Sequence, residues 1–450
     1  MGKRLMSDLG SSFLELDRLS DEDRLLRDEV HRFAVDVLRP AAADLDSMAP
    51  QDRAAPGSPF FSAMIELKRL GFHELFLPLE PGTEDPDGRI AESKALTQAI
   101  VLEELGWGSL GLATAFACDM VPFMSVASFG SPELKKEIFE PWLNDTEGKF
   151  HGCWAITEPN HGSDYVSLWD TGDGEAPKAQ LIAVKEEGGW RLNGQKSAWV
   201  SSAPVATHVA LHAQAGAEGN LRRGLFAVLA LDTPGVTKGP VTQLLGMHDE
   251  PMGELFFNDV WLPDANVLVP PGPLYMLFGD QLLCMTSALI SQVAVGVARA
   301  AFEEALDYAR QRVQGGKVIA EHKNVRLTLY SMFEKVECAR AYARKALEHV
   351  VRETAMLGGT APATAFASPR HTRAAQILTK RIAFEVANDA VQIWGAGGLS
   401  EVAMVEKLFR DTRCLWVEDG TLEMLALNAA TDIVRHYEHE TYNPAEVMAR

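Results

Sequence analysis

The chain has few cysteines and few basic residues for its length. Only five cysteines occur among 450 residues, and none forms a closely spaced pair of the kind that holds a metal ion. Their low and odd number argues against a disulfide framework and favours a reducing, cytoplasmic compartment. Lysine and arginine number 42 against 62 aspartates and glutamates, which gives a formal net charge of −20. This excess of acid argues against a surface for nucleic acid or an anionic membrane.

The sequence also lacks a long uninterrupted hydrophobic run. Residues 1–8 contain no apolar core of a signal peptide. The longest apolar stretch, Leu282 to Phe302, is interrupted by Ser291, Gln292 and Arg299. We therefore expect a buried helix of a bundle there and no membrane span.

Three regions of different texture divide the chain. Residues 1–150 are typical of helices: Ser20 to Asp23 form a helix start, and apolar residues then recur at helical spacing until Pro40. Residues 151–270 contain short apolar runs between Gly, Pro and Asp, the pattern of strands. The remainder, 271–450, predicts four long helices. We expect these over 278–313, 322–354, 370–394 and 403–437, with loops at 170–177 and 358–369.

Two segments in mid-chain carry side chains suited to a ligand. Residues 155–164, Ala-Ile-Thr-Glu-Pro-Asn-His-Gly-Ser-Asp, join a hydroxyl and a proline to a turn. Gly162 lets backbone approach a ligand closely, and Ser163 supplies a hydrogen-bonding hydroxyl. Residues 192–199 end in Trp199, a flat surface on which a ring can stack. Together these features could hold a flat, phosphate-bearing cofactor, although each is weak alone.

Both blocks, in this order, resemble the flavin-binding signatures of the acyl-CoA dehydrogenase family. Further similarity occurs at 308–323 and 390–420, so the resemblance covers nearly the whole chain. It implies an α+β fold, acyl-CoA dehydrogenase-like, with an N-terminal helical domain (1–150), a central β-domain (151–270) and a C-terminal four-helix bundle (271–450). It also implies FAD and the removal of an α-proton and a β-hydride from an acyl-CoA thioester.

The resemblance divides the FAD-binding residues into two groups. Thr157 and Ser201 would lie near the flavin ring, Trp199 against it and Ser163 near a phosphate. In the second group Arg312 would bind the pyrophosphate, with Gln392 and Gly395 on the adenosine-phosphate half, all reaching into a neighbouring subunit. A homodimer or homotetramer is thus implied. The full predicted set is Trp154, Ile156, Thr157, Gly162, Ser163, Trp199, Ser201, Arg312, Gln392, Gly395 and Thr421.

Two details of these motifs bear on the prediction. One residue more than in the commonest family pattern separates Lys196 from Trp199. The glycines at 395–398 could be taken for a dinucleotide-binding turn, but that turn needs a preceding strand, and residues 384–394 are typical of a helix.

The position of the catalytic base departs from the family pattern. A glutamate usually precedes Gly-Thr, whereas here Asp419 does, with Glu418 one step earlier. The reference pKa values of Asp and Glu differ by only about 0.4 unit. The reach changes by roughly 1.5 Å, and a misplacement of about 1 Å can cost about a hundredfold in rate. Another base position, known in some members, is occupied by Thr286, which cannot act as a carboxylate. Asp419 is therefore the predicted base, and on a regular element Glu418 would point elsewhere.

Four further features have less specific interpretations. Asp119 could be a second proton acceptor, but we favour a helix-end or solvent-facing acid. His436 and His439 indicate a solvated tail and not a metal site. An arginine often found after the base is Ala426 here. Two segments linked to the acyl and CoA side also differ from the family, 79–86 and 246–251, the latter without its usual basic residue.

Several functions remain open at this point. The favoured one is a cytoplasmic acyl-CoA dehydrogenase that passes electrons to an electron-transfer flavoprotein. An aspartate base also fits a nitroalkane-oxidase-like flavin oxidase, and a related variant would act on an acyl group carried by a carrier protein. The altered base, the altered segment 79–86 and the missing arginine at Ala426 are also compatible with an inactive subunit of a heteromer.

Overall fold

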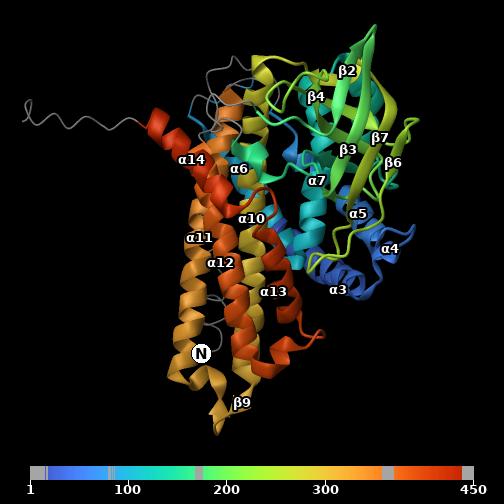
Figure 1. Ribbon diagram of the computed structural model, residues 1–450. Helices are drawn as coiled ribbons and strands as arrows, with labels where there is room; N and C mark the ends of the chain where they lie inside the picture. The colour runs from blue at the N-terminus through green and yellow to red at the C-terminus, as the bar shows by residue number, and fades with distance from the viewer. Residues whose placement is uncertain are drawn as a thin grey trace, which may run out of the picture.

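The computed structural model describes residues 19–79, 87–167, 176–356 and 369–437, together with residues 16, 83 and 85. The strands gather at one end of the molecule beside the N-terminal helices, and the long helices α10, α11 and α12 run side by side away from them (Figure 1). The predicted loops at 170–177 and 358–369, and His439, lie largely or wholly outside the described residues.

The N-terminal part is helical, as predicted, but its first helix continues past Pro40. A five-residue π-helical stretch, η1, precedes the proline, which then occupies the first turn of α3. The Arg39 N–H bonds the carbonyl of Ala34, five residues earlier, and this wider π turn accommodates a proline, which has no N–H to bond within the helix. The elements are α2 (Asp21–Phe33), η1 (Ala34–Leu38), α3 (Arg39–Ser47), α4 (Pro50–Arg53), α5 (Pro59–Arg69), η2 (Phe72–Phe76), α6 (Arg89–Gly108), α7 (Leu110–Phe129), α8 (Pro132–Leu134), η3 (Lys135–Phe139) and α9 (Glu140–Leu143).

The predicted start of the first helix is confirmed. The Ser20 hydroxyl accepts the N–H of Asp23 at 3.0 Å, and the Asp23 carboxylate accepts the N–H of Ser20 at 3.0 Å. This reciprocal pair satisfies two N–H groups that a helix end leaves free.

The central part forms one mixed sheet with strand order β6-β7-β3-β2-β4-β5-β8, and β1 pairs with β4. The five predicted strands are present, whereas β1, β6 and β8 were not predicted, because runs of three or four residues carry little periodicity. The elements are β1 (Gly152–Ala155), η4 (Ser163–Ser167), β2 (Ile182–Glu186), β3 (Gly189–Ser201), β4 (His208–Ala215), β5 (Gly224–Ala230), β6 (Val236–Lys238), β7 (Met252–Pro263), η5 (Asp264–Asn266) and β8 (Val267–Val269).

A bulge in β3 accommodates the unusual spacing between Lys196 and Trp199. Lys196 is opposite Leu255 of β7, and Val200 is opposite Gly253, so four steps along β3 match two along β7. The residues between them are looped out of the regular ladder, which re-aims their side chains.

The C-terminal part differs from its prediction at one important place. The expected helix over 403–437 is two helices, separated by a turn over 416–421. Asp419 has φ 49° and Gly420 has φ 101°, left-handed values that cannot continue a right-handed helix. The elements are α10 (Pro273–Gln311), β9 (Val313–Gln314), β10 (Lys317–Val318), η6 (Ile319–Glu321), α11 (Lys323–Met356), α12 (Pro369–Trp394), η7 (Gly395–Leu399), α13 (Met404–Leu415) and α14 (Leu422–His436).

The stretch Leu282 to Phe302 lies inside α10, and its residues 293–298 are all buried, as expected of a bundle helix. Two described helices, Leu110–Phe129 and Pro273–Gln311, have the length and apolar composition of a membrane span, but 72% of the most apolar window of each is buried inside the fold. Burial within the core explains their composition, and neither helix indicates a membrane protein.

Candidate functional site

The two mid-chain blocks are joined by a fully buried ion pair. Lys196 Nζ lies 2.8 Å from Glu158 Oε1, and neither side chain is exposed. The same ammonium donates to the carbonyl of Ile156 at 3.1 Å. Beside it, the hydroxyls of Thr157 and Ser197 lie 2.6 Å apart. The predicted ligand residues of the first block are thereby fixed against the bulge of β3.

Lys196→Met is expected to lower the free energy of unfolding by roughly 3–5 kcal/mol, because it leaves the Glu158 carboxylate buried without its cation. Urea-induced unfolding followed by circular dichroism measures this change. The matched control is Lys185→Met, whose partner Asp264 lies at the surface; both side chains are 49% exposed. That loss should not exceed about 1 kcal/mol. Equal effects of the two variants would contradict a structural role for the buried pair.

The first block also meets the turn that separates α13 from α14. Ser163 Oγ accepts the backbone N–H of Thr421 at 2.9 Å, although 258 positions separate the two residues. The Ser163 hydroxyl still has its own proton to donate. Two predicted residues, Ser163 and Thr421, are thus brought together beside Asp419.

The Asp419 carboxylate is held by two neutral groups. Gln376 Nε2 donates to Asp419 Oδ2 at 3.3 Å and to its carbonyl oxygen at 3.2 Å. The Thr286 hydroxyl lies 3.1 Å from the same Oδ2 and 3.2 Å from the carbonyl of Leu283, so one proton serves both. Burial raises the pKa of Asp419, and the charges of Lys380 and Arg373 together with these two contacts oppose the rise. The result is a carboxylate poised to accept a proton.

Helix α12 clamps the turn through Gln376 and Lys380, one helical turn apart. Lys380 Nζ donates to the carbonyls of Glu418 and Gly420, the latter at 3.2 Å. Burial lowers the pKa of Lys380 to about 8, against the pull of Asp419 and Glu418. The ammonium therefore fixes the backbone on both sides of Asp419.

A chain of polar side chains sets the direction of the Gln376 amide. Ser287 Oγ donates to Gln376 Oε1 at 2.7 Å. Arg373 donates to that serine hydroxyl and, at 2.6 Å, to the carbonyl of Leu283; its Nε donates to Asn428 Oδ1 at 3.2 Å. Because Oε1 is occupied by Ser287, Nε2 must face Asp419. The sequence could have indicated these contacts, because polar residues at 373, 376 and 380 recur on one buried face of a helix.

On a regular element Glu418 would point away from the site. The structure differs from this expectation. The Oε2 of Glu418 is buried and has no hydrogen-bond partner among the described residues. Burial raises the pKa of Glu418 to about 7, with Asp419 adding to the rise and Lys380 opposing it. The alternation expected for neighbouring residues fails because the left-handed turn at Asp419 reverses the local chain direction.

The remaining residues predicted near the flavin have room for a ligand. Trp154 Nε1 is buried without a partner among the described residues, and Ile156 lines a cavity of about 20 Å³ between the sheet and α10. A Cβ added at Gly162 would meet no atom within 4 Å. Trp199 is 60% exposed, unusual for so large an apolar ring. An unpaired donor, an open backbone and an exposed ring fit a flat cofactor such as FAD.

The second predicted group lies far from the first. Arg312 follows the end of α10, and Gln392 and Gly395 are at the end of α12; all three are exposed at the tip marked by β9 in Figure 1. At about 1.5 Å per residue, Arg312 is roughly 40 Å along α10 from Thr286. Tyr308 and Trp394 stack at 4.4 Å and hold the two helix ends together. Within one chain, these residues cannot touch the same ring as Trp199.

Asp119 is neither solvent-facing nor at a helix end. It lies in the middle of α7 and is 2% exposed. Its oxygens accept the indole N–H of Trp142 at 3.1 Å and the N–H of Gly152 at 2.9 Å, and Lys68 lies 4.0 Å away. The favoured interpretation was therefore wrong: these contacts give Asp119 a structural role, tying α7 to β1.

His436 pairs with Asp432 at 3.0 Å, and no metal-binding group of His, Cys, Asp or Glu occurs in the described ranges.

Comparisons with known proteins cover all three regions. The family models described as acyl-CoA dehydrogenase N-terminal domain, middle domain and C-terminal domain match residues 20–145, 153–260 and 282–434. A benzylmalonyl-CoA dehydrogenase of Aromatoleum aromaticum is 29% identical over 419 residues, 92% of this chain and 98% of the relative. The mitochondrial short-chain specific acyl-CoA dehydrogenase of Rattus norvegicus is 28% identical, with 93% and 92% covered.

Solved structures agree with the fold predicted from the sequence. A glutaryl-coenzyme A dehydrogenase in complex with glutaryl-CoA is 26% identical with a TM-score of 0.76, covering 94% of this chain and 99% of the other. A butyryl-CoA dehydrogenase from Megasphaera elsdenii, 24% identical with a TM-score of 0.75 and coverages of 93% and 99%, shows the same fold. The predicted fold class is thereby confirmed.

Proposed function

The chain belongs to the acyl-CoA dehydrogenase family, and from this premise we propose that Asp419 removes the α-proton of an acyl-CoA thioester. FAD-dependent dehydrogenation of an acyl-CoA follows from family membership. The observation that supports the choice of base is the half-buried Asp419 carboxylate, held by Thr286 and Gln376 in a turn that Lys380 clamps. A base must be held within reach of its proton, and this arrangement restricts the short side chain to one position.

The chain's own residues divide the work of the reaction. Burial raises the proton affinity of Asp419, while the contacts from Thr286, Gln376 and Lys380 keep the charged form accessible. FAD, when bound, supplies the acceptor for the hydride that leaves the β-carbon. Asp419 is half-buried against helices α10 and α12, and this partial removal from water strengthens the charge interactions there.

We further propose which residues hold FAD. Trp199 offers its exposed ring to the flavin, and the hydroxyls of Thr157 and Ser201 lie in the adjoining segments. Arg312 would bind the pyrophosphate of a cofactor held by a neighbouring subunit, because its planar guanidinium suits phosphate oxygens. The roughly 40 Å separation within one chain supports an assembly of at least two subunits, and we favour a homotetramer. The other proposed contacts are Trp154, Ile156, Gly162, Ser163, Gln392, Gly395 and Thr421.

The wider setting of the enzyme is also a proposal. All five cysteines are free thiols, which suits the cytoplasm, and an electron-transfer flavoprotein is the proposed electron acceptor. We also propose domain limits near residues 150 and 270.

Anaerobic mixing of the FAD-loaded protein with straight, branched and cyclic acyl-CoAs tests the function: the flavin band should bleach with at least one of them. Bleaching by a nitroalkane, with none of the acyl-CoAs active, would favour a flavin oxidase instead.

Gln376→Leu is expected to move the acidic limb of the pH–rate profile upward by about one pH unit. The amide donates to the charged form of Asp419, so its loss raises the pKa of that carboxyl, and activity appears only at higher pH. The limiting rate at high pH should be retained, because the base itself is intact. The measurement is the pH dependence of flavin reduction with one saturating acyl-CoA.

Gln292→Leu is the matched control for this variant. Gln292 is equally buried, on α10, and its amide donates to the carbonyls of Ala288 and Ala343, away from Asp419. Its removal should leave the acidic limb unchanged even if stability falls. A limb that shifts equally in both variants, or in neither, would contradict a specific contact between Gln376 and the base.

A further inference from the structure

Two further carboxyls, those of Glu250 and Glu418, lie near the proposed base. Glu250 is 1% exposed, and neither of its carboxyl oxygens has a hydrogen-bond partner among the described residues; the same holds for Glu418 Oε2. The Ser201 hydroxyl is close enough to Glu250 to favour its charged form, yet it does not meet hydrogen-bond geometry. Burying a carboxyl without a partner is unfavourable, because it loses its hydrogen bonds to water and gains none in return. A fold that keeps two such groups together points to a ligand that completes them.

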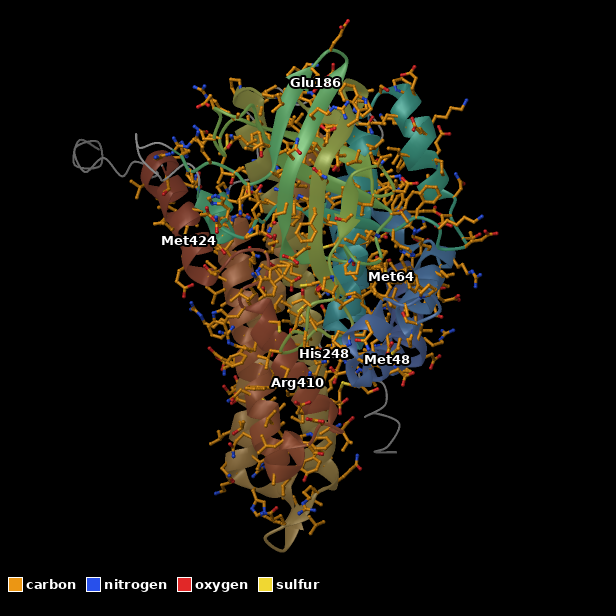
Figure 2. The ribbon with its side chains drawn as sticks, turned by 45° about the vertical axis from the view of Figure 1, so that its right-hand side comes forward. Met48, Met64, Glu186, His248, Arg410 and Met424 are labelled. Atoms are coloured by element: carbon orange, nitrogen blue, oxygen red, sulfur yellow. The ribbon has the colours of Figure 1, made fainter. Side chains whose placement is uncertain are left out.

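The loop over residues 246–250 directs Glu250 inward. Met247 has φ 53°, and its N–H donates to Asp411 Oδ1 at 2.6 Å. The neighbouring Asp249 is fully buried against Lys407 at 3.1 Å. Figure 2 shows His248 and Arg410 next to each other where this loop meets α13. A Cβ at Gly246 would lie 2.5 Å from the Arg410 carbonyl carbon, so the loop packs directly against α13. Glu250 therefore cannot turn outward to water.

Glu250 lies close enough to Glu418 for the charge of Glu418 to raise its pKa, and Glu418 is the chain neighbour of Asp419. Ser201 is opposite Met252 in the β3–β7 ladder, so Glu250, two residues earlier, lies at the strand end beside Ser201. The thiol of Cys118, on α7, has a pKa raised well above its usual range by burial and then by Glu250 and Glu418, with Asp419 adding to the effect. Three separate elements thus bring Glu250, Glu418 and Cys118 close to the proposed base.

We propose that Glu250 and Glu418 select the acyl group: they accept hydrogen bonds from a hydroxyl or ammonium group on it, and they reject an acyl group that ends in a carboxylate. This inference rests on the proposed function. Two adjacent acids that share one proton still have free acceptor oxygens between them. Of the two nearby cations, Lys380 is bonded to backbone carbonyls, and Arg373 to Ser287, Leu283 and Asn428.

The electrostatics of the pair agree with this assignment. Burial, followed by the charge of Glu418, raises the pKa of Glu250 well above its usual value. An anion brought next to this pair would add to the repulsion and raise both pKa values further, so it could bind only together with a proton. A donor group would relieve that repulsion, which is why a hydroxyl or an ammonium should gain affinity there.

Four unreactive CoA thioethers with five-carbon chains provide the test: pentyl-, 5-hydroxypentyl-, 5-aminopentyl- and 4-carboxybutyl-CoA. Their affinities for the FAD-loaded protein are measured by isothermal titration calorimetry. At least one of the hydroxyl and amino compounds should bind at least about tenfold more tightly than the carboxylate compound. In Glu250→Gln/Glu418→Gln this preference should shrink severalfold, while pentyl-CoA should bind about as before. Which of the two donors gains more identifies the class of acyl group.

Glu186→Gln/Glu187→Gln is the matched control, since it also replaces two carboxyls and these exposed glutamates lie at the far tip of the sheet, where Figure 2 labels Glu186. Thermal unfolding checks that each variant is folded. Tight binding of 4-carboxybutyl-CoA, or a donor preference that the double variant retains, would overturn the inference while leaving the proposed function intact. Failure of pentyl-CoA itself to bind would instead count against the proposed function.

Discussion

Asp419→Asn should reduce the rate of flavin reduction by an acyl-CoA by at least about a thousandfold. An amide cannot take the α-proton, and general bases contribute typically 10²–10⁴-fold. The variant should fold and retain FAD, because asparagine tolerates the left-handed backbone that residue 419 adopts at φ 49°. Its amide can still pair with Thr286 or Gln376. Stopped-flow absorbance of the flavin band under anaerobic conditions measures the rate.

Asp419→Glu distinguishes a site built for the shorter base from one that only lacks the longer one. The extra methylene moves the carboxylate by roughly 1.5 Å, away from contacts of 3.1 and 3.3 Å. A loss of up to about a hundredfold is expected. Asp264→Asn, at the surface, serves as a control with no expected effect. Full activity in Asp419→Asn would show that another residue takes the proton.

Lys380→Met should produce the second largest effect, a loss of about a hundredfold at neutral pH together with about 3 kcal/mol of stability. The ammonium clamps the carbonyls of Glu418 and Gly420 and holds the pKa of Asp419 down. Without it the pKa of Asp419 rises, the base is protonated at neutral pH, and the acidic limb of the profile moves upward. Part of the lost rate should return as the pH is raised.

The basic limb gives an independent check on Lys380. Because the pKa of Lys380 is about 8, wild-type activity should decline above about pH 8 as the clamp loses its charge. The Lys380→Met profile should lack this decline. Lys335→Met is the matched control, since Lys335 pairs with Glu385 at 3.0 Å on the opposite, more exposed side of α12. Identical profiles for Lys380→Met and the wild type would contradict the proposed clamp.

The sequence was sufficient for the fold, and it led to Asp419 as the proposed base. Helical and strand periodicities located the three regions, and the Ser20 cap was correct because it depends on residues three apart. The blocks at 155–164 and 192–199 predicted a shared site, and Lys196 with Glu158 is the contact that joins them. Local patterns and short motifs succeed where the relevant contacts are encoded within a few residues.

Contacts between distant segments could not be read in this way. The break at 416–421 was missed because helical spacing continues on either side of two left-handed residues. Gln376 supports Asp419 across 43 positions, and Glu250 reaches the same space from a loop seated on α13. Nothing in the spacing of either residue indicates its partner. Asp119 was misjudged because its partners come from other parts of the chain.

Hydrogen exchange at the α-carbon tests the central claim most directly. A 3-thiaacyl-CoA, in which sulfur replaces the β-carbon, can lose an α-proton but has no β-hydride to give. Incubated with the FAD-loaded wild type, its α-deuterated form should lose deuterium to water, as followed by mass spectrometry, whereas Asp419→Asn should leave the label in place. Washout in Asp419→Asn at the wild-type rate would contradict the account.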